Sequence, residues 1–209
     1  MSTICSVRVT AASLAVVTAF IFSASLAIAQ DPAPGLAEVR EPERPGRGGF
    51  WLGLGVGAGG ESFDLSPSVG YSNVLYKPTV SFRLGGTLGQ QLRLGAEVLS
   101  WINEVGPAVE SLSSALFITQ FYPWSSAGLY LKGGVGIGRN AVDFDDGYGE
   151  GDTGFAGLIG AGYELRLSKR FFLNPSIDLV GHRYDHGAAG DYRERLVNFG
   201  LGIILQTGR

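Results

Sequence analysis

Eight stretches of the chain alternate apolar residues with small or polar ones at a period of two, beginning at Gly49 and ending at Leu205. In the first stretch the glycines at 53, 55, 57 and 59 share one face with Trp51, while Phe50 and every second residue after it form an apolar face. A period of two predicts β-strands. Each stretch covers about ten residues, the length that a tilted strand needs to cross a bilayer, whereas soluble sandwiches more often use strands of five or six.

The connections between these stretches alternate in length. The connections that we expect to be long and polar are 61–75, 103–110, 140–152 and 183–193, and those that we expect to be short are 89–91, 123–127 and 167–169. Long connections at one end and short turns at the other are typical of transmembrane β-barrels. The sequence therefore predicts an all-β fold, an eight-stranded antiparallel up-and-down transmembrane β-barrel over residues 49–209.

The face opposite the apolar one carries glycine mixed with charged residues, and glycine makes up 33 of the 209 residues. An eight-stranded barrel has an interior just wide enough for side chains to fill it, so glycines relieve crowding there. Buried charges need partners of opposite sign. We therefore expect a network of ion pairs in the lumen, formed by Arg83, Arg93, Glu97, Lys132, Glu164 and Asp178.

The first 29 residues have the features of a cleavable signal peptide. Arg8 precedes an uncharged run, and Ala27-Ile28-Ala29 forms a small-residue cleavage site before Gln30. The alternative is an uncleaved membrane anchor, since the run is about long enough to span. Residues 30–48 are rich in proline and mixed charge, which predicts a flexible periplasmic linker.

Composition excludes some chemistry from the mature chain. The single cysteine, Cys5, lies in the leader, so we expect no disulfide and no cysteine metal ligand. Without Arg8, the mature chain carries 15 basic and 19 acidic residues and has no basic tract. Nucleic acid is therefore not an expected partner.

From Gly49 to Leu205 the sequence resembles the small bacterial outer-membrane β-barrel superfamily, typified by the transmembrane domain of outer-membrane protein A. The segments "LYLKGGVGIG" and "VNFGLGIIL" carry the resemblance. It implies export through the Sec pathway to the bacterial outer membrane, contact with outer-membrane lipid and lipopolysaccharide, dependence on the barrel-assembly machinery, and no cofactor. One departure is the ending "LQTGR", because such proteins usually end on an aromatic residue that this machinery reads.

An acidic stretch, "DFDDGYGEGD", is a candidate cation site. Its carboxylates are Asp143, Asp145, Asp146, Glu150 and Asp152. Dense carboxylates suit a hard cation such as calcium, but the EF-hand spacing fails because Gly147 stands where a third ligand is needed. The other interpretation, which we favour, is a solvated, charge-rich surface loop.

Two histidines, His182 and His186, raise the possibility of an enzyme. The chain resembles the outer-membrane lipid A deacylases in having a histidine late in the penultimate strand. In that family a serine nucleophile follows two positions later, whereas this chain has Tyr184. The favoured function is a non-enzymatic structural or surface-interaction role through outward loops. The alternatives are a lipid A-modifying or surface hydrolase using His182, and a narrow pore or small-molecule carrier.

Gly55, Gly57 and Gly60 match the spacing of a dinucleotide-binding turn, G-x-G-x-x-G. Such a turn needs a helix directly after the glycines and an acidic residue about 20 positions later. Here a polar stretch with Pro67 follows, and the region from Tyr76 to Phe82 holds no acid. We interpret these glycines as part of the lumen face of the first strand.

Overall fold

The computed structural model describes residues 47–64, 70–144, 149–185 and 191–207. The predicted signal peptide and the linker up to residue 46 lie outside these ranges. Within them no helix is long and apolar enough to cross a membrane.

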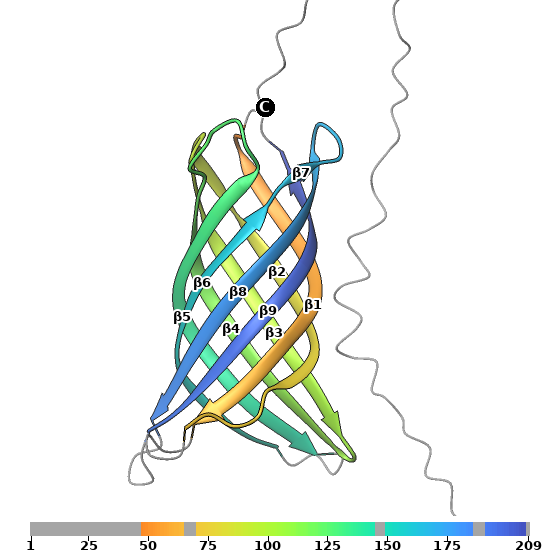
Figure 1. The fold of residues 1–209 in the computed structure, drawn as a ribbon, viewed down its shortest axis with the longest axis vertical. Helices are drawn as coiled ribbons and strands as arrows, with labels where there is room; N and C mark the ends of the chain where they lie inside the picture. The colour runs from red at the N-terminus through yellow and green to blue at the C-terminus, as the bar shows by residue number, and fades with distance from the viewer. Residues whose placement is uncertain (1–46, 65–69, 145–148, 186–190, 208–209) are drawn as a thin grey trace, which may run out of the picture. The chain divides into compact units, whose positions relative to one another are not determined.

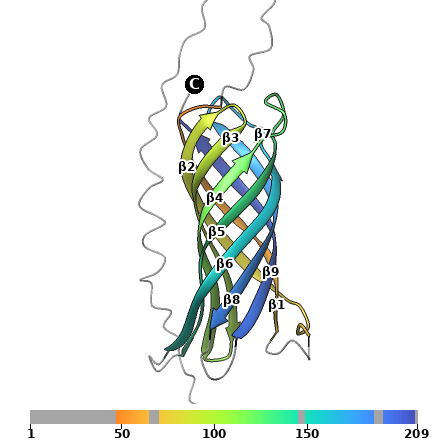
Figure 2. The same ribbon diagram turned by 90° about the vertical axis from the view of Figure 1, so that its left-hand side faces the viewer.

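The described chain is built from antiparallel strands that wind around a common axis (Figures 1 and 2). Eight of the strands have 14 to 16 residues, and β7 has two. The strands are β1 (Phe50–Asp64), β2 (Leu75–Gly89), β3 (Leu92–Val105), β4 (Ala108–Phe121), β5 (Leu129–Phe144), β6 (Gly149–Tyr163), β7 (Leu165–Arg166), β8 (Phe171–Asp185) and β9 (Asp191–Gln206).

The sheet closes on itself. Each strand from β1 to β5 pairs with the next, β9 pairs with both β1 and β8, and β6 pairs with β8. The short β7 continues β6 after a break at Glu164, whose backbone N–H donates to the carbonyl of Gly128 at 3.0 Å. Counting β6 and β7 as one interrupted strand, the chain forms the predicted eight-stranded barrel, in which each of the eight long described strands pairs on both sides.

The two ends of the barrel differ. At the turn end β1 begins, β9 ends, and the connections at 90–91, 122–128 and 167–170 lie; at the loop end β1, β5 and β8 end, β2, β6 and β9 begin, and the connection at 106–107 lies. The prediction of a long loop over 103–110 is wrong, because strands β3 and β4 continue to a two-residue turn. Gly106 has a φ of 59°, which glycine adopts at little cost as the first residue of such a tight hairpin.

Alternation sorts the side chains as predicted. Apolar residues such as Val56, Val135 and Ile159 are well exposed on the outer face, while the glycine-bearing face lines the lumen. Glycine there makes room for large neighbours: a Cβ atom on Gly95 would lie 2.8 Å from the ring of Trp51. On β4 the side chains of Leu112, Leu116 and Ile118 are buried inside the barrel.

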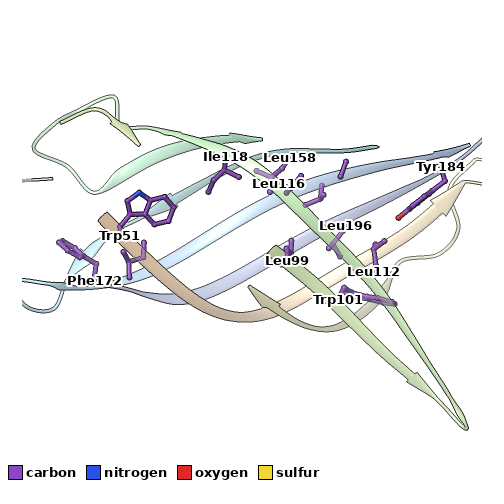
Figure 3. Packing of buried hydrophobic residues seen from close by; sticks show 13 residues of the cluster. Trp51, Leu99, Trp101, Leu112, Leu116, Ile118, Leu158, Phe172, Tyr184 and Leu196 are labelled. Carbon is purple, nitrogen blue, oxygen red and sulfur yellow. The ribbon is translucent and has the colours of Figure 1, made fainter. Parts of the chain in front are cut away.

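The lumen therefore contains an apolar cluster as well as charges (Figure 3). Its buried members are Trp51, Leu99, Trp101, Leu112, Leu116, Ile118, Ala156, Leu158, Phe172, Val180, Tyr184, Leu196 and Ile204. Such packing supplies the dispersion contacts that a well-filled interior requires.

Candidate functional site

Four of the six predicted lumen charges form one network. The Nζ atom of Lys132 on β5 lies 2.7 Å from Glu97 on β3 and 3.0 Å from Asp178 on β8. The guanidinium of Arg83 on β2 lies 3.7 Å from Glu97 and donates a hydrogen bond to the hydroxyl of Tyr130 at 3.3 Å. The four charged side chains are buried, so their charges balance one another across the lumen rather than facing water.

The other two predicted charges meet closer to the turn end. Arg93 forms a close ion pair with Glu164, and it also donates to Tyr122 at 2.9 Å and to Gln206 at 2.7 Å. The hydroxyl of Tyr122 donates to Glu164 at 2.8 Å. This second network lies on the turn-end side of the first.

Arg47 joins the turn-end network, although it falls within the predicted linker. Its guanidinium carbon lies 3.9 Å from the ring centre of Tyr122, and its Nε atom lies 3.7 Å from Glu164. The side chain also donates to the carbonyl oxygens of Ser125 and Ala127. Burial lowers the pKa of Arg47 below its ordinary value, an effect opposed by the nearby Tyr122 and Glu164. Sequence analysis missed this residue because it precedes the alternation that starts at Gly49.

Beside Arg47 lies a cavity of about 260 Å³ that opens at the turn end. Arg166, Lys169 and Gln206 line it together with Arg47 and Glu164. The ion pair between Arg47 and Glu164 forms part of its wall.

Acidic and amide side chains fill the loop end of the lumen. Asn140 donates to Glu194 at 2.5 Å, and Asn103 donates to Glu110 at 3.0 Å. Glu61 is also buried there, with 7% of its surface exposed. Apart from Glu194, these residues lie in segments that the sequence assigned to loops, whereas continuing the alternation by two or three residue pairs would have placed them in the lumen.

His182 has a serine partner that sequence spacing did not reveal. Its Nε2 atom lies 2.8 Å from the hydroxyl oxygen of Ser114 on β4, and both side chains are buried. A histidine can activate a serine at this distance. However, a Cβ atom on Gly138 would overlap the His182 ring, so the wall is in close contact with the imidazole on that side. The histidine also stacks near Tyr184, the residue that replaces the expected nucleophile, with ring centres 6.0 Å apart.

The acidic stretch is only partly a loop. Asp143 is the second-last residue of β5, while Glu150 and Asp152 belong to β6. Asp152 accepts a hydrogen bond from Tyr192 at 3.0 Å. Asp145, Asp146 and His186 lie outside the described residues. Among the residues that are described, no group of three or more His, Cys, Asp or Glu side chains is arranged to hold a metal ion.

Sequence comparison matches the chain to no protein family and to no curated protein. Solved structures do resemble it. The chain is similar to Ail, the attachment invasion locus protein of Yersinia pestis, with a TM-score of 0.51 and 10% identity over 76% of this chain and 99% of the other. It is also similar to Neisserial surface protein A, with a TM-score of 0.50 and 15% identity over 78% and 99%. At these identities the likeness concerns the fold.

A second structure of Ail, in complex with the heparin analogue sucrose octasulfate, gives the same TM-score of 0.51 at 11% identity, over 75% of this chain and 99% of that one. The likeness again spans almost the entire length of the solved chain.

Proposed function

We propose that the chain is a small outer-membrane β-barrel, as its closed sheet and its likeness in fold to Ail and Neisserial surface protein A suggest, and that it acts without enzymatic activity through the residues at its loop end. The filled lumen carries this proposal. The apolar cluster, the network around Lys132 and the network around Glu164 occupy successive parts of the interior. Contact with other molecules is therefore expected at the ends and outer face of the barrel rather than in the lumen.

A pore function has less support. Eight strands enclose a space that side chains fill, unlike the water-filled channels of barrels with 16 or more strands. In this barrel the space at Lys132 is crossed by ion pairs from β5 to β3 and to β8. Conduction would require several buried ion pairs to separate together.

A hydrolase function needs more than a serine beside a histidine. It needs a general base oriented by a third group and donors for the oxyanion, with space for the scissile bond between them. The described Ser114 and His182 lie inside the packed lumen, and the Nδ1 atom of His182 has no hydrogen-bond partner among the described residues. We infer that the pair stabilises the barrel wall.

A surface-interaction role is consistent with the kinds of protein that share the fold. The name of one similar protein refers to attachment and invasion, and that of another to a bacterial surface. At the loop end, Tyr71 packs on the guanidinium of Arg195 with 3.8 Å from the ring centre to the guanidinium carbon. This contact anchors one of the rim connections to the barrel wall.

Cell fractionation and gel mobility test the proposal together. We expect the protein in the outer-membrane fraction, running faster on unboiled than on boiled gels because the closed barrel resists detergent. Planar bilayers containing it should show conductance at noise level. Recovery as a soluble periplasmic protein would exclude membrane insertion, and steady conductance steps would favour the pore.

A further inference from the structure

The turn end of the barrel carries an excess of positive charge. The described residues there are 47–51, 87–93, 120–130, 163–173 and 204–207, and they hold five basic residues and one acidic residue, a net formal charge of +4. The basic residues are Arg47, Arg93, Arg166, Lys169 and Arg170. The acidic residue, Glu164, is already paired with Arg47 and Arg93. The other three bases take part in none of the five ion pairs found between described residues.

Two of these three bases, Arg166 and Lys169, line the cavity of about 260 Å³ beside Arg47, and both side chains are exposed. The Nε atom of Arg166 donates to the carbonyl oxygen of Ser168 at 3.3 Å, and its two terminal nitrogens have no partner among the described residues. The lining also includes the aromatic and apolar side chains of Tyr163, Leu165 and Phe172. The cavity therefore combines unpaired cations with an apolar wall.

The same cavity borders a strand edge without a partner strand. β7 pairs with β8, and no described strand lies on its other side. Leu167 donates its backbone N–H toward β8, to the carbonyl oxygen of Phe171 at 2.9 Å. Because neighbouring residues of a strand direct their backbone groups to opposite sides, Arg166 directs its N–H and C=O away from β8. Glu164 faces the same way and donates to Gly128, which also lines the cavity. The free edge at Arg166 therefore faces the cavity.

We propose that this cavity binds the carboxyl terminus of an extended peptide. The last residues of the peptide add to the free edge of β7 by pairing with the backbone of Arg166, as in other cases where a peptide extends a sheet. The terminal carboxylate contacts the side chains of Arg166 and Lys169 through charge-assisted hydrogen bonds. The last side chain of the peptide packs on Tyr163, Leu165 and Phe172. This inference concerns the turn end and does not depend on the role proposed for the loop end.

Three features of the cavity favour a peptide end over a free anion. A phosphate ion or a small carboxylate would use the two cations, but it would leave the apolar wall and the edge of β7 without a partner. The volume of about 260 Å³ is slightly below the range of about 300–1,000 Å³ that is typical of ligand pockets. A cavity of this size encloses one or two residues, which favours the end of a peptide over an internal segment.

Binding is measured with the protein refolded in detergent micelles. The probe is the fluorescein-labelled peptide GSTSF with a free carboxyl terminus, and its fluorescence anisotropy is followed as protein is added. Faster migration on unboiled gels verifies that each variant is folded. The amidated peptide lacks the terminal charge, and we expect it to bind roughly tenfold more weakly, because a charge-assisted hydrogen bond contributes about that factor. Equal binding of the two peptides, or a folded barrel that binds neither, would overturn this inference and leave the role of the loop end untouched.

The charge requirement is tested with the double variant Arg166→Gln/Lys169→Gln. We expect it to bind the free-carboxyl peptide roughly tenfold more weakly than the wild type does. It should bind the amidated peptide as the wild type does, because amidation and the double substitution remove the same interaction. Arg170→Gln is the matched control and should leave binding unchanged, since it removes an exposed base of the same turn that does not line the cavity. Equal weakening by the control would overturn the assignment of the carboxylate to Arg166 and Lys169.

The cavity itself is tested with Ser126→Trp. Ser126 is an exposed residue of the lining, so we expect the indole to fill the cavity while the barrel still folds. Ser125→Trp is the matched control, because Ser125 is also exposed but does not line the cavity. We expect Ser126→Trp alone to abolish binding. If both variants bind the peptide as the wild type does, the cavity is not the binding site.

The pairing with β7 is tested with two further peptides, one methylated on the amide nitrogen of its last residue and the other on that of the residue before it. Neighbouring residues of a strand face opposite sides, so only one of these amides points toward Arg166. We expect one methylated peptide to bind about fivefold more weakly, the effect of one lost hydrogen bond, and the other to bind as the unmodified peptide does. Equal effects of the two methylations would show that the peptide does not extend the sheet.

Discussion

The ammonium group of Lys132 lies 2.7 Å from the carboxylate of Glu97, on a strand that is not its neighbour in the sheet. β4 separates the two strands, so the ion pair crosses the lumen instead of following the wall. With Asp178 at 3.0 Å, a single cation connects β3, β5 and β8. These ion pairs across the lumen stabilise the barrel in addition to the backbone hydrogen bonds between its strands.

Replacing Lys132 by methionine should lower the free energy of unfolding by about 3–5 kcal/mol, because two carboxylates then share only Arg83 in a buried site. Urea titration of the refolded barrel, followed by gel mobility, measures the change. Adding Asp178→Asn should recover much of the loss, since Glu97 keeps Arg83 as its partner. An unfolding midpoint unaffected by Lys132→Met would show that the network contributes little.

Replacing Gly57 by leucine should prevent closure of the barrel. A Cβ atom there would overlap the backbone oxygen of Phe199 and lie 2.7 Å from the hydroxyl of Thr79. The yield of the fast-migrating form on unboiled gels measures closure, with Gly86→Leu as a control of equal size on the open outer face. Normal folding of Gly57→Leu would contradict the assignment of this glycine to a crowded lumen.

Replacing His182 or Ser114 by alanine should leave lipid A chemically unchanged. Each substitution removes one buried hydrogen bond and should cost about 1 kcal/mol of stability. Mass spectra of lipid A from cells with the wild-type protein, with either variant and without the protein would be identical on this view. A mass difference that depends on both residues would revive the hydrolase alternative.

Replacing Arg47 by alanine should lower the free energy of unfolding by about 2 kcal/mol. The substitution removes the buried contact of the guanidinium with the Tyr122 ring and its ion pair with Glu164. Glu164 keeps Arg93 as a partner, so the loss is smaller than that expected for Lys132. Urea titration again provides the measurement. A loss as large as that of Lys132→Met would mean that Arg47 holds the turn end together.

The fold could be predicted because one pattern extends through the chain. A period of two fixes which face each residue takes, and in the structure the six charged residues and Trp51 are all buried. Strand ends were harder to predict. Asn103 and Glu110 have the polarity of loop residues, yet they pair across a hairpin inside the lumen. Polarity alone does not distinguish a solvated loop from a polar lumen.

The contacts between distant strands were beyond the sequence. Ser114 and His182 are 68 positions apart, and no local spacing brings them together. Only the order and register of the strands show that β4 and β8 face each other across the interior. Arg47 illustrates the same limit, since its partners lie on turns far along the chain.

The apolar outer face of the barrel limits where the barrel can close. Residues such as Phe50, Val56 and Phe155, each at least 60% exposed, would meet water if the barrel closed before reaching a bilayer. Large exposed apolar surfaces promote aggregation. We therefore expect closure of the barrel to coincide with its entry into lipid, where this apolar face is covered.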